Sequence, residues 1–155
     1  MNLVIRKAHK SDAPELHRLM VQLISKPLQL EEVEKRLDFI ATSPIEELYV
    51  CTGEKSEDLA EGHERLLGAL GFRVRENIED YTRYGEISVL VTDKESRRLG
   101  VGRQLVEYAE ELAAARDCIG TWLVSGIERE EAHTFYKKLG YEITGYRFVK
   151  AGGKS

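Results

Sequence analysis

Cysteine and long apolar runs are scarce in this chain, and each scarcity excludes a class of protein. The only two cysteines among 155 residues, Cys51 and Cys118, lie far apart and fit no zinc spacing, so we expect two reduced thiols and no bound metal. No apolar run approaches the roughly 20 residues that span a bilayer. The opening residues 1–7 lack the apolar core of a signal peptide. We therefore expect a soluble cytoplasmic protein without a membrane partner.

A surplus of positive charge is also missing. The 23 lysines and arginines are outnumbered by 27 acidic residues, which leaves a net charge of −4 at pH 7. Proteins that bind nucleic acid are usually basic, so nucleic acid is not an expected partner. The length predicts a single domain over 1–150, followed by a flexible tail over 151–155.

The apolar residues that are present follow two periods. Helical spacing predicts helices that begin near residues 12, 30, 100 and 128, the first capped by Ser11 or Asp12. Alternating or continuous apolar runs predict strands over 3–7, 48–51, 66–74, 86–92, 119–125, 141–144 and 146–149. The run 119–125 is typical of a strand buried on both faces. The order predicts an α/β (α+β) fold, with a single mixed, mostly antiparallel sheet of about six to seven strands flanked by about four helices.

One loop suits an anion. The residues Arg97-Arg98-Leu99-Gly100-Val101-Gly102 join the strand 86–92 to the next helix. Free amides at a helix start, the helix dipole and arginine side chains all favour phosphate there. The alternative is an exposed basic helix start without a ligand. A G-x-G-x-x-G loop would need a small residue where Leu105 stands, and a G-x-x-x-x-G-K-[ST] loop would need glycine at Phe148.

The loop instead fits the pattern Arg/Gln-x-x-Gly-x-Gly/Ala, and it resembles the acetyl-CoA loop of the GCN5-related N-acetyltransferase (GNAT) family. The stretch Ala132–Tyr141 resembles that family's Ala-x-x-Phe-Tyr-x-x-x-Gly-Phe/Tyr signature, in the family's order and spacing. Within the family, Gly85-Glu86-Ile87 and the residues 132–136 and 146–150 are similar to a small bacterial group that includes aminoalkylphosphonate N-acetyltransferases.

The resemblance implies acetyl-CoA as cosubstrate. Backbone amides of the loop would hold the pyrophosphate, and arginines would neutralise part of its charge. The backbone of strand 86–92 would pair with the pantetheine arm and direct one amide at the thioester carbonyl. Arg129 stands where many relatives carry an Asn that contacts the pantetheine, so it would contact the coenzyme or the substrate. The alternative is a solvated surface arginine. The implied coenzyme-binding residues are Leu90, Val91, Thr92, Arg97, Arg98, Leu99, Gly100, Val101, Gly102, Arg103, Arg129 and Phe135.

Two residues are candidates for catalysis. The resemblance implies that Tyr136 protonates the leaving thiolate; the alternative is a core tyrosine. Glu86 would take a proton from the acceptor ammonium, directly or through water. Many members of the family have an acidic residue at the position of Val89 instead. The alternative interpretation of Glu86 is a solvated carboxylate at the start of the strand. Weaker candidates for the acceptor cleft are Tyr84, Ser88, Ser125 and His63.

These observations predict an N-acetyltransferase that moves an acetyl group from acetyl-CoA to a primary amine of a small molecule. Direct transfer in a ternary complex is favoured because no Ser/His/Asp or Cys/His arrangement emerges. Two alternatives stay open. One is a protein or peptide N-acetyltransferase, whose basic acceptor the acidic loop 53–64 would attract. The other is a non-catalytic acetyl-CoA-binding regulatory module. A homodimer through the late strands also stays open.

Overall fold

The computed structural model describes residues 2–53 and 64–153 of the chain. The chain forms two compact units, residues 1–122 and residues 123–155, and each is described by itself. The expectation of one domain over 1–150 stays a prediction. The expected acidic loop falls mostly on residues outside the described ranges.

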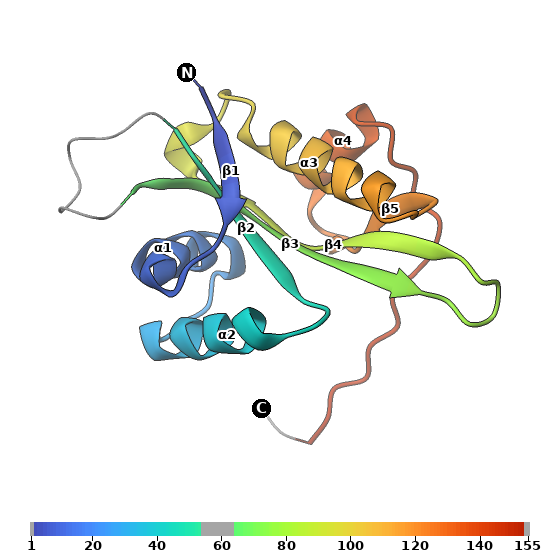
Figure 1. Ribbon diagram of the computed structural model, residues 1–155, viewed down its shortest axis with the longest axis horizontal. Helices are drawn as coiled ribbons and strands as arrows, with labels where there is room; N and C mark the ends of the chain where they lie inside the picture. Colours follow the sequence, from blue (N-terminus) through green and yellow to red (C-terminus); the bar gives the residue numbers. More distant parts are fainter. Residues whose placement is uncertain (1, 54–63, 154–155) are drawn as a thin grey trace. The chain divides into compact units, whose positions relative to one another are not determined.

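Five strands of the described residues form one sheet in the order β1-β2-β3-β4-β5 (Figure 1). Their bounds are β1 (Val4–Lys7), β2 (Glu47–Thr52), β3 (Leu66–Glu76), β4 (Arg83–Thr92) and β5 (Gly120–Leu123). The first four strands pair antiparallel with their neighbours. The Ile119 amide donates to the Arg83 carbonyl at 2.8 Å, and a Cβ added to the next residue, Gly120, would lie 3.2 Å from the ring of Tyr84; β5 therefore begins beside the start of β4 and runs in the same direction. The mixed, mostly antiparallel sheet and the α+β class are confirmed, with fewer strands than expected.

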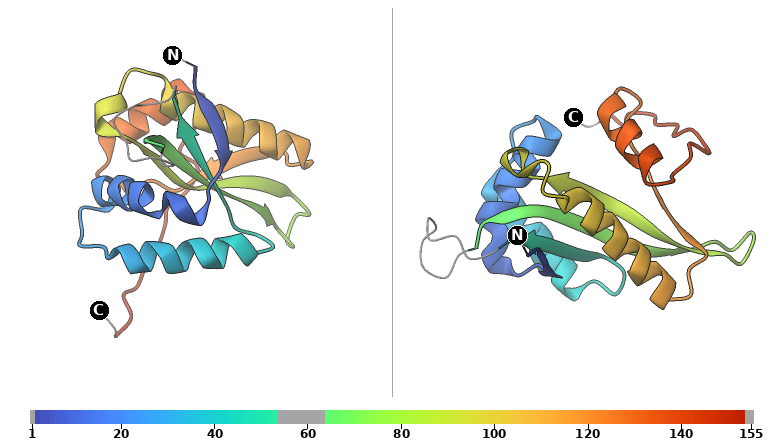
Figure 2. Two further views of the ribbon diagram at one scale, coloured as in Figure 1. Left: turned by 60° about the vertical axis from the view of Figure 1, so that its left-hand side comes forward. Right: turned by 90° about the horizontal axis from the view of Figure 1, so that it is seen from above.

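Helices α1 (Ala13–Ile24) and α2 (Leu30–Thr42) cover one face of the sheet, and α3 (Val101–Ala115) covers the other (Figure 2). The stripe of leucines in α1 packs on the first face, in a core that includes Leu16, Leu19, Val33, Leu37, Ala69 and Val91. On the opposite face, a Cβ added to Gly68 would lie 2.8 Å from the Val101 side chain. Glycine at that position therefore lets α3 approach the sheet. Helix α4 (Glu130–Lys138) belongs to the second unit.

The helix boundaries follow local signals. Pro14 lies in the first turn of α1, where its missing amide costs no hydrogen bond. Asp12 occupies the N-cap position of α1, as expected for one of two candidates, but its carboxylate binds Arg6 instead of a helix amide. Helix α4 is followed by Gly140, whose φ of +96° suits the end of a helix.

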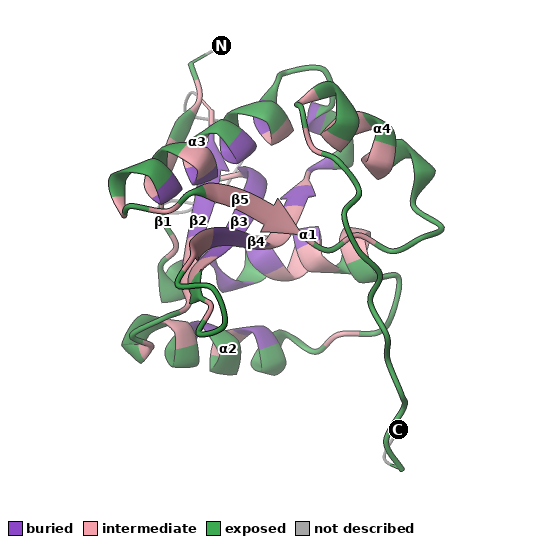
Figure 3. Cartoon of the chain, turned by 90° about the vertical axis from the view of Figure 1, so that its right-hand side faces the viewer, coloured by how far each residue is buried: buried purple, intermediate pink, exposed green. Residues whose placement is uncertain are grey.

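The predicted strands over 141–144 and 146–149 are wrong, because residues 141–153 contain no strand. Apart from the half-buried Tyr141, their alternating apolar residues lie exposed (Figure 3); Phe148, for example, is 93% exposed. Alternation alone does not form a strand, since a strand also needs a neighbour to pair with.

The predicted strand over 119–125 is shorter than expected and is not buried on both faces. Strand β5 is half-buried, and the flanking Ile119 and Val124 are exposed. It stands last in the strand order of the described residues, so β4 alone flanks it. Within the ranges 2–53 and 64–153, no helix has both the length and the apolar character needed to cross a bilayer.

Candidate active site

The predicted anion loop connects β4 to α3 in the first unit. A short 3-10 turn, η2 (Lys94–Ser96), follows β4, and α3 begins at Val101. Arg98 and Gly100 adopt left-handed backbone conformations, with φ of +75° and +78°. Such turns gather successive amides into a concave surface that suits an anion. The first-turn amides of α3 have no intrahelical acceptor, and Gly100 offers no side chain to cap them.

The charges around this loop also suit an anion. Arg97 and Arg98 are exposed and form no ion pair with any residue of the described ranges. The first turn of α3 contains no acidic residue. Arg103 differs, because its Nε lies 3.1 Å from Glu107 Oε1, one helical turn further on. Arg97 and Arg98 are thus the more available cations for a pyrophosphate.

Strand β4 has an irregularity in its middle. Gly71 faces Val89 and Phe72 faces Ile87, so Ser88 is an extra residue on β4, a β-bulge. A Cβ added to Gly71 would lie 2.5 Å from Ser88 Oγ and 3.2 Å from the Val89 amide nitrogen. Gly71 therefore provides the space that the bulge occupies.

The implied pantetheine-binding residues lie beyond this bulge. Leu90, Val91 and Thr92 face Leu70, Ala69 and Gly68 of β3, respectively. On its other side β4 has β5 as a neighbour. The four residues of β5 begin beside Arg83, at the opposite end of the ten-residue β4. Within the described residues, β5 is thus too short to pair with Leu90–Thr92, which suits an added extended arm.

Glu86 lies before the bulge and is almost fully buried, in a cluster of charges. Arg73 Nη2 donates to Glu86 Oε2 at 2.7 Å, and Arg75 Nε lies 3.2 Å from Glu86 Oε1. Arg73 also binds Glu46 at 2.8 Å. Because Arg73 lies opposite Glu86 in the ladder, the two side chains share one face of the sheet, the face opposite α3. Glu86 is therefore an ion-paired carboxylate, and not the solvated one of the alternative interpretation.

The second unit holds Arg129, Phe135 and Tyr136. Arg129 is the N-cap residue of α4, and the rings of Phe135 and Tyr136 meet edge to face with centroids 5.3 Å apart. The ring of Tyr141 lies 6.1 Å from that of Tyr136. Burial raises the pKa of Tyr136 above its usual value near 10, although the positive charge of Arg129 opposes this shift. The Tyr136 hydroxyl therefore keeps its proton at neutral pH.

The weaker candidates are dispersed. Ser88 forms the bulge, and Tyr84 lies opposite Arg75 on the sheet. Ser125 belongs to the second unit, where its buried Oγ has no hydrogen-bond partner among the described residues. His63 lies outside the described residues. Both cysteines are free, and burial raises the pKa of Cys51 to about 11. The described part of the chain brings together no group of three His, Cys, Asp or Glu side chains suited to a metal.

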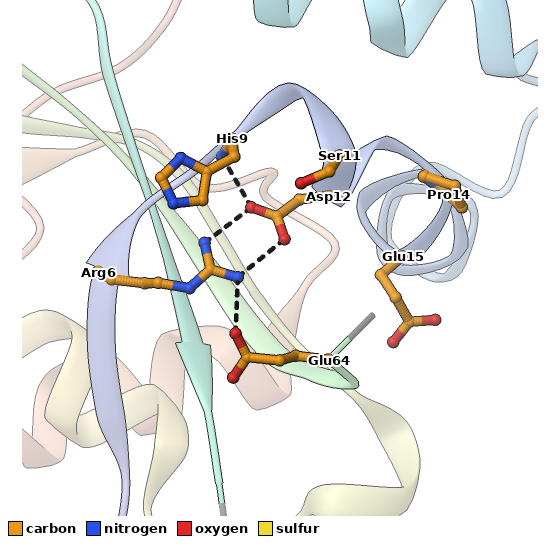
Figure 4. Close-up of a pocket in the computed structure, with 7 residues that line it drawn as sticks. All are labelled: Arg6, His9, Ser11, Asp12, Pro14, Glu15 and Glu64. Carbon is orange, nitrogen blue, oxygen red and sulfur yellow. Dashed lines mark hydrogen bonds and ion pairs between the residues drawn. The ribbon is translucent and has the colours of Figure 1, made fainter. Parts of the chain in front are cut away.

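A separate pocket lies at the start of α1 (Figure 4). Its centre is a two-point ion pair between Arg6 and Asp12, with contacts of 2.8 and 2.9 Å. Arg6 also reaches Glu64 at 3.3 Å, and the His9 amide donates to Asp12 at 2.7 Å. The charged groups that line the pocket are thus largely paired with one another.

The sequence reasoning missed the ion pairs around two acidic residues, Glu86 and Asp93. Asp93 begins the loop after β4 and is fully buried, with Arg18 and Arg65 as its ionic partners. Arg18 and Asp93 lie 75 residues apart in the chain. No local pattern marks such a pairing, so no sequence signal was available for it.

The fold and the loop define an acyltransferase-like domain, and comparison with known protein families identifies the family. Residues 16–141 match the model of the acetyltransferase (GNAT) family. Because the match covers most of the chain, the protein belongs to this family.

A curated relative is the aminoalkylphosphonate N-acetyltransferase of Salmonella typhimurium, which is 33% identical over 86 residues. That alignment covers 56% of this chain and 56% of the relative, so the chain spans about half the length of the curated relative it matches.

Solved structures agree on the fold. A transcriptional regulator from Bacillus halodurans superposes with a TM-score of 0.84 at 19% identity, over 97% of this chain and 100% of that chain. An aminoglycoside N-acetyltransferase in complex with CoA superposes with a TM-score of 0.78 at 15% identity, over 99% of this chain and 96% of that chain. At these identities the likeness establishes the fold alone.

Proposed function

We propose that this protein is an acetyl-CoA-dependent N-acetyltransferase that transfers the acetyl group directly to a primary amine in a ternary complex. The observation that carries the proposal is the turn before α3. It combines left-handed conformations at Arg98 and Gly100, open first-turn amides, and two exposed arginines without an ionic partner in the described residues. This donor set fits a pyrophosphate, and membership of the GNAT family supports acetyl-CoA as its source.

In this proposal the first unit holds the coenzyme. The residues Arg97–Arg103 bind the pyrophosphate, and the backbone of Leu90–Thr92 pairs with the pantetheine arm. The resemblance to the family implies Arg129 and Phe135 as further coenzyme-binding residues. Bound acetyl-CoA supplies an activated acetyl group. A backbone amide directed at the thioester carbonyl would stabilise the negative charge that develops on the carbonyl oxygen. The amide is already held in place by the fold, so it does not have to reorient during the reaction.

Two side chains move protons in the proposed reaction. Tyr136 donates its proton to the departing thiolate, a role that suits a hydroxyl held protonated by burial. Glu86 accepts the proton of the acceptor ammonium through water. A water relay is favoured because the Glu86 carboxylate is almost fully buried and its Oε2 already accepts a hydrogen bond from Arg73.

The proposal is tested by calorimetric titration with acetyl-CoA and by thiol release over a panel of amines. We expect saturable coenzyme binding and turnover of at least one amine.

Replacing both Arg97 and Arg98 with Gln should weaken coenzyme binding about tenfold or more, because two charge-assisted contacts are lost. Lys35→Gln combined with Arg36→Gln removes the same number of charges from exposed positions of α2, so this variant controls for net charge and should bind normally. Coenzyme binding without turnover of any amine or peptide would indicate the regulatory module instead. Absent coenzyme binding would overturn the proposal.

A narrower proposal concerns the acceptor, which we infer to be an amine that also carries an acidic group. The curated relative acetylates aminoalkylphosphonates by its name. Arg75 is half exposed and uses only its Nε toward Glu86 among the described residues, so its two Nη groups remain able to bind an anion. Arg75→Gln should raise the KM for an aminoalkylphosphonate but not for a plain alkylamine, and Arg75→Lys should restore part of the difference. Equal effects on both amines would exclude this role.

A further inference from the structure

A buried carboxylate stands at the first residue after β4. Asp93 is 0% exposed and accepts hydrogen bonds from four side chains. Its Oδ1 receives Arg18 Nη1 at 2.9 Å and Gln22 Nε2 at 3.1 Å. Its Oδ2 receives Arg65 Nη2 at 3.1 Å and Ser96 Oγ at 3.2 Å. Burying a carboxylate is costly unless such partners compensate, and here both oxygens are fully engaged.

Two of the four donors come from helix α1. Glu15, Arg18 and Gln22 are spaced three and four residues apart, so they share one face of that helix. Arg18 also donates to the Leu66 carbonyl at 2.9 Å, while Glu15 accepts from the Leu66 amide at 2.9 Å. One stripe of α1 thus holds both the start of β3 and the start of the loop.

Gln22 binds the loop at two successive residues. Its Nε2 donates to the Asp93 carboxylate, and its Oε1 accepts from the Lys94 amide at 3.0 Å. The backbone of Asp93 is held as well. Its amide donates to the Leu67 carbonyl at 2.8 Å, and its carbonyl accepts from the Ser96 amide at 2.9 Å. The turn 93–96 is therefore held through the carboxylate, the backbone amide and the backbone carbonyl of Asp93.

The loop changes from buried to exposed immediately after this turn. Ser96 is buried, whereas Arg97, Arg98, Leu99 and Gly100 are all exposed. The exposed residues have few packing contacts of their own to define their path. Their two anchors are the fixed turn 93–96 and the first turn of α3, where Val101 is buried. An anion site built from backbone amides depends on such anchoring, because small displacements misdirect every donor together.

We propose that Asp93 is a positioning residue for the coenzyme loop, and that Gln22 holds the first two residues of that loop through its contacts with Asp93 and Lys94. This inference rests on the proposed function, because it assumes that the loop binds acetyl-CoA. Asp93 itself is fully buried, so it would act on the loop and not on the coenzyme directly. Its task is to keep the amides of 99–103 and the exposed arginines in the arrangement that binds pyrophosphate.

The test compares variants with a matched control. Asp93→Asn keeps the shape of the side chain but replaces one acceptor oxygen with an amide, and Gln22→Ala removes both contacts of a half-buried residue. Asp12→Asn is the control, since Asp12 is also a buried carboxylate in a two-point arginine pair but lies at the start of α1. Each variant is assayed for the acetyl-CoA Kd by calorimetry, for KM and kcat, and for unfolding in urea.

We expect Asp93→Asn and Gln22→Ala to raise the Kd and KM for acetyl-CoA about five- to tenfold, with kcat at saturating coenzyme within about twofold. Asp12→Asn should lose stability yet bind acetyl-CoA normally. Gln22→Glu should bind more weakly than Gln22→Ala, because it places a second carboxylate against Asp93. If Asp93→Asn does not fold, the two Gln22 variants decide. A normal Kd in the folded loop variants, or an equal rise in Asp12→Asn, would overturn the inference. Failure of the wild-type protein to bind acetyl-CoA would instead overturn the proposed function.

Discussion

At the scale of single residues, Tyr136 has the environment of a proton donor. Burial raises the pKa of its hydroxyl, so the group is protonated through the neutral and mildly alkaline range. An acid of this kind serves a leaving thiolate only while it keeps its proton. In the proposed reaction, the raised pKa of Tyr136 would extend the pH range of activity upward.

We predict that Tyr136→Phe lowers kcat about 100-fold, the lower range for loss of a general acid, while the acetyl-CoA Kd stays within about twofold. The ratio of wild-type to variant kcat should be constant between pH 7 and pH 9, because burial keeps the pKa of Tyr136 above its usual value near 10. Tyr146→Phe, whose ring is 86% exposed, is the control and should leave kcat unchanged. Stopped-flow or steady-state thiol release measures both. An unchanged kcat in Tyr136→Phe would remove Tyr136 from the reaction.

At the scale of elements, the bulge of β4 depends on a glycine of the neighbouring strand. The space that a Cβ would need at Gly71 is occupied by Ser88 Oγ and the backbone of Val89. The Oγ can rotate away, but the Val89 backbone belongs to the ladder. A side chain at Gly71 must therefore shift β4 next to Glu86 and the implied pantetheine-binding residues.

We predict that Gly71→Ala destabilises the protein by about 1–3 kcal/mol, the range for overpacking, and lowers kcat/KM. Adding Ser88→Ala removes the closest contact and should recover part of the lost stability. Gly145→Ala is the control, because nothing lies within 4 Å of the Cβ it would add. Urea unfolding and thiol release measure the two effects. Wild-type stability in Gly71→Ala would show that the bulge is not tightly packed against β3.

Elements with a strong internal period were predictable, whereas those that depend on a partner were not. The stripe of α1 and the loop-to-helix signal of α3 each predicted a helix that the structure contains. The alternation over 141–149 carried the same kind of signal, but a strand exists only with a neighbouring strand. Likewise, the continuous apolar run at 119–125 gave no indication that β5 ends the sheet of the described residues.

At the scale of the whole molecule, the candidate site also has a part that the sequence predicts and a part that it does not. The residues 97–102 were recognisable because the motif is local and lies between a strand and a helix. The charges that support the site were not recognisable, since Arg73 pairs with Glu86 and Arg18 with Asp93 across the fold. Several carboxylates of the first unit are held by arginines in this way, which links the stability of the fold to pH.

These ion pairs make the fold sensitive to acid. Burial by itself would raise the pKa of Asp93, but hydrogen bonds from Gln22 and Arg18, together with the charges of Arg18 and Arg65, lower it to about 2. The pKa values of Asp12 and Glu15 are also lowered against the effect of burial, by Arg6 and Arg18 respectively. Each group binds its proton more readily in the unfolded chain, so acid favours unfolding.

We predict that the free energy of unfolding is nearly constant from pH 7 to pH 5 and then falls as the pH drops from about 5 to 2. Asp93 alone should account for about 2 kcal/mol of this fall, since its pKa shifts by nearly two units at about 1.4 kcal/mol each. Asp93→Asn should therefore be less stable than the wild type at pH 7, with the gap closing by about 2 kcal/mol at pH 2. Urea unfolding at unit pH intervals measures both curves. A wild-type free energy that stays flat down to pH 3, or a gap that does not narrow, would contradict the ionic role of Asp93 in the folded protein.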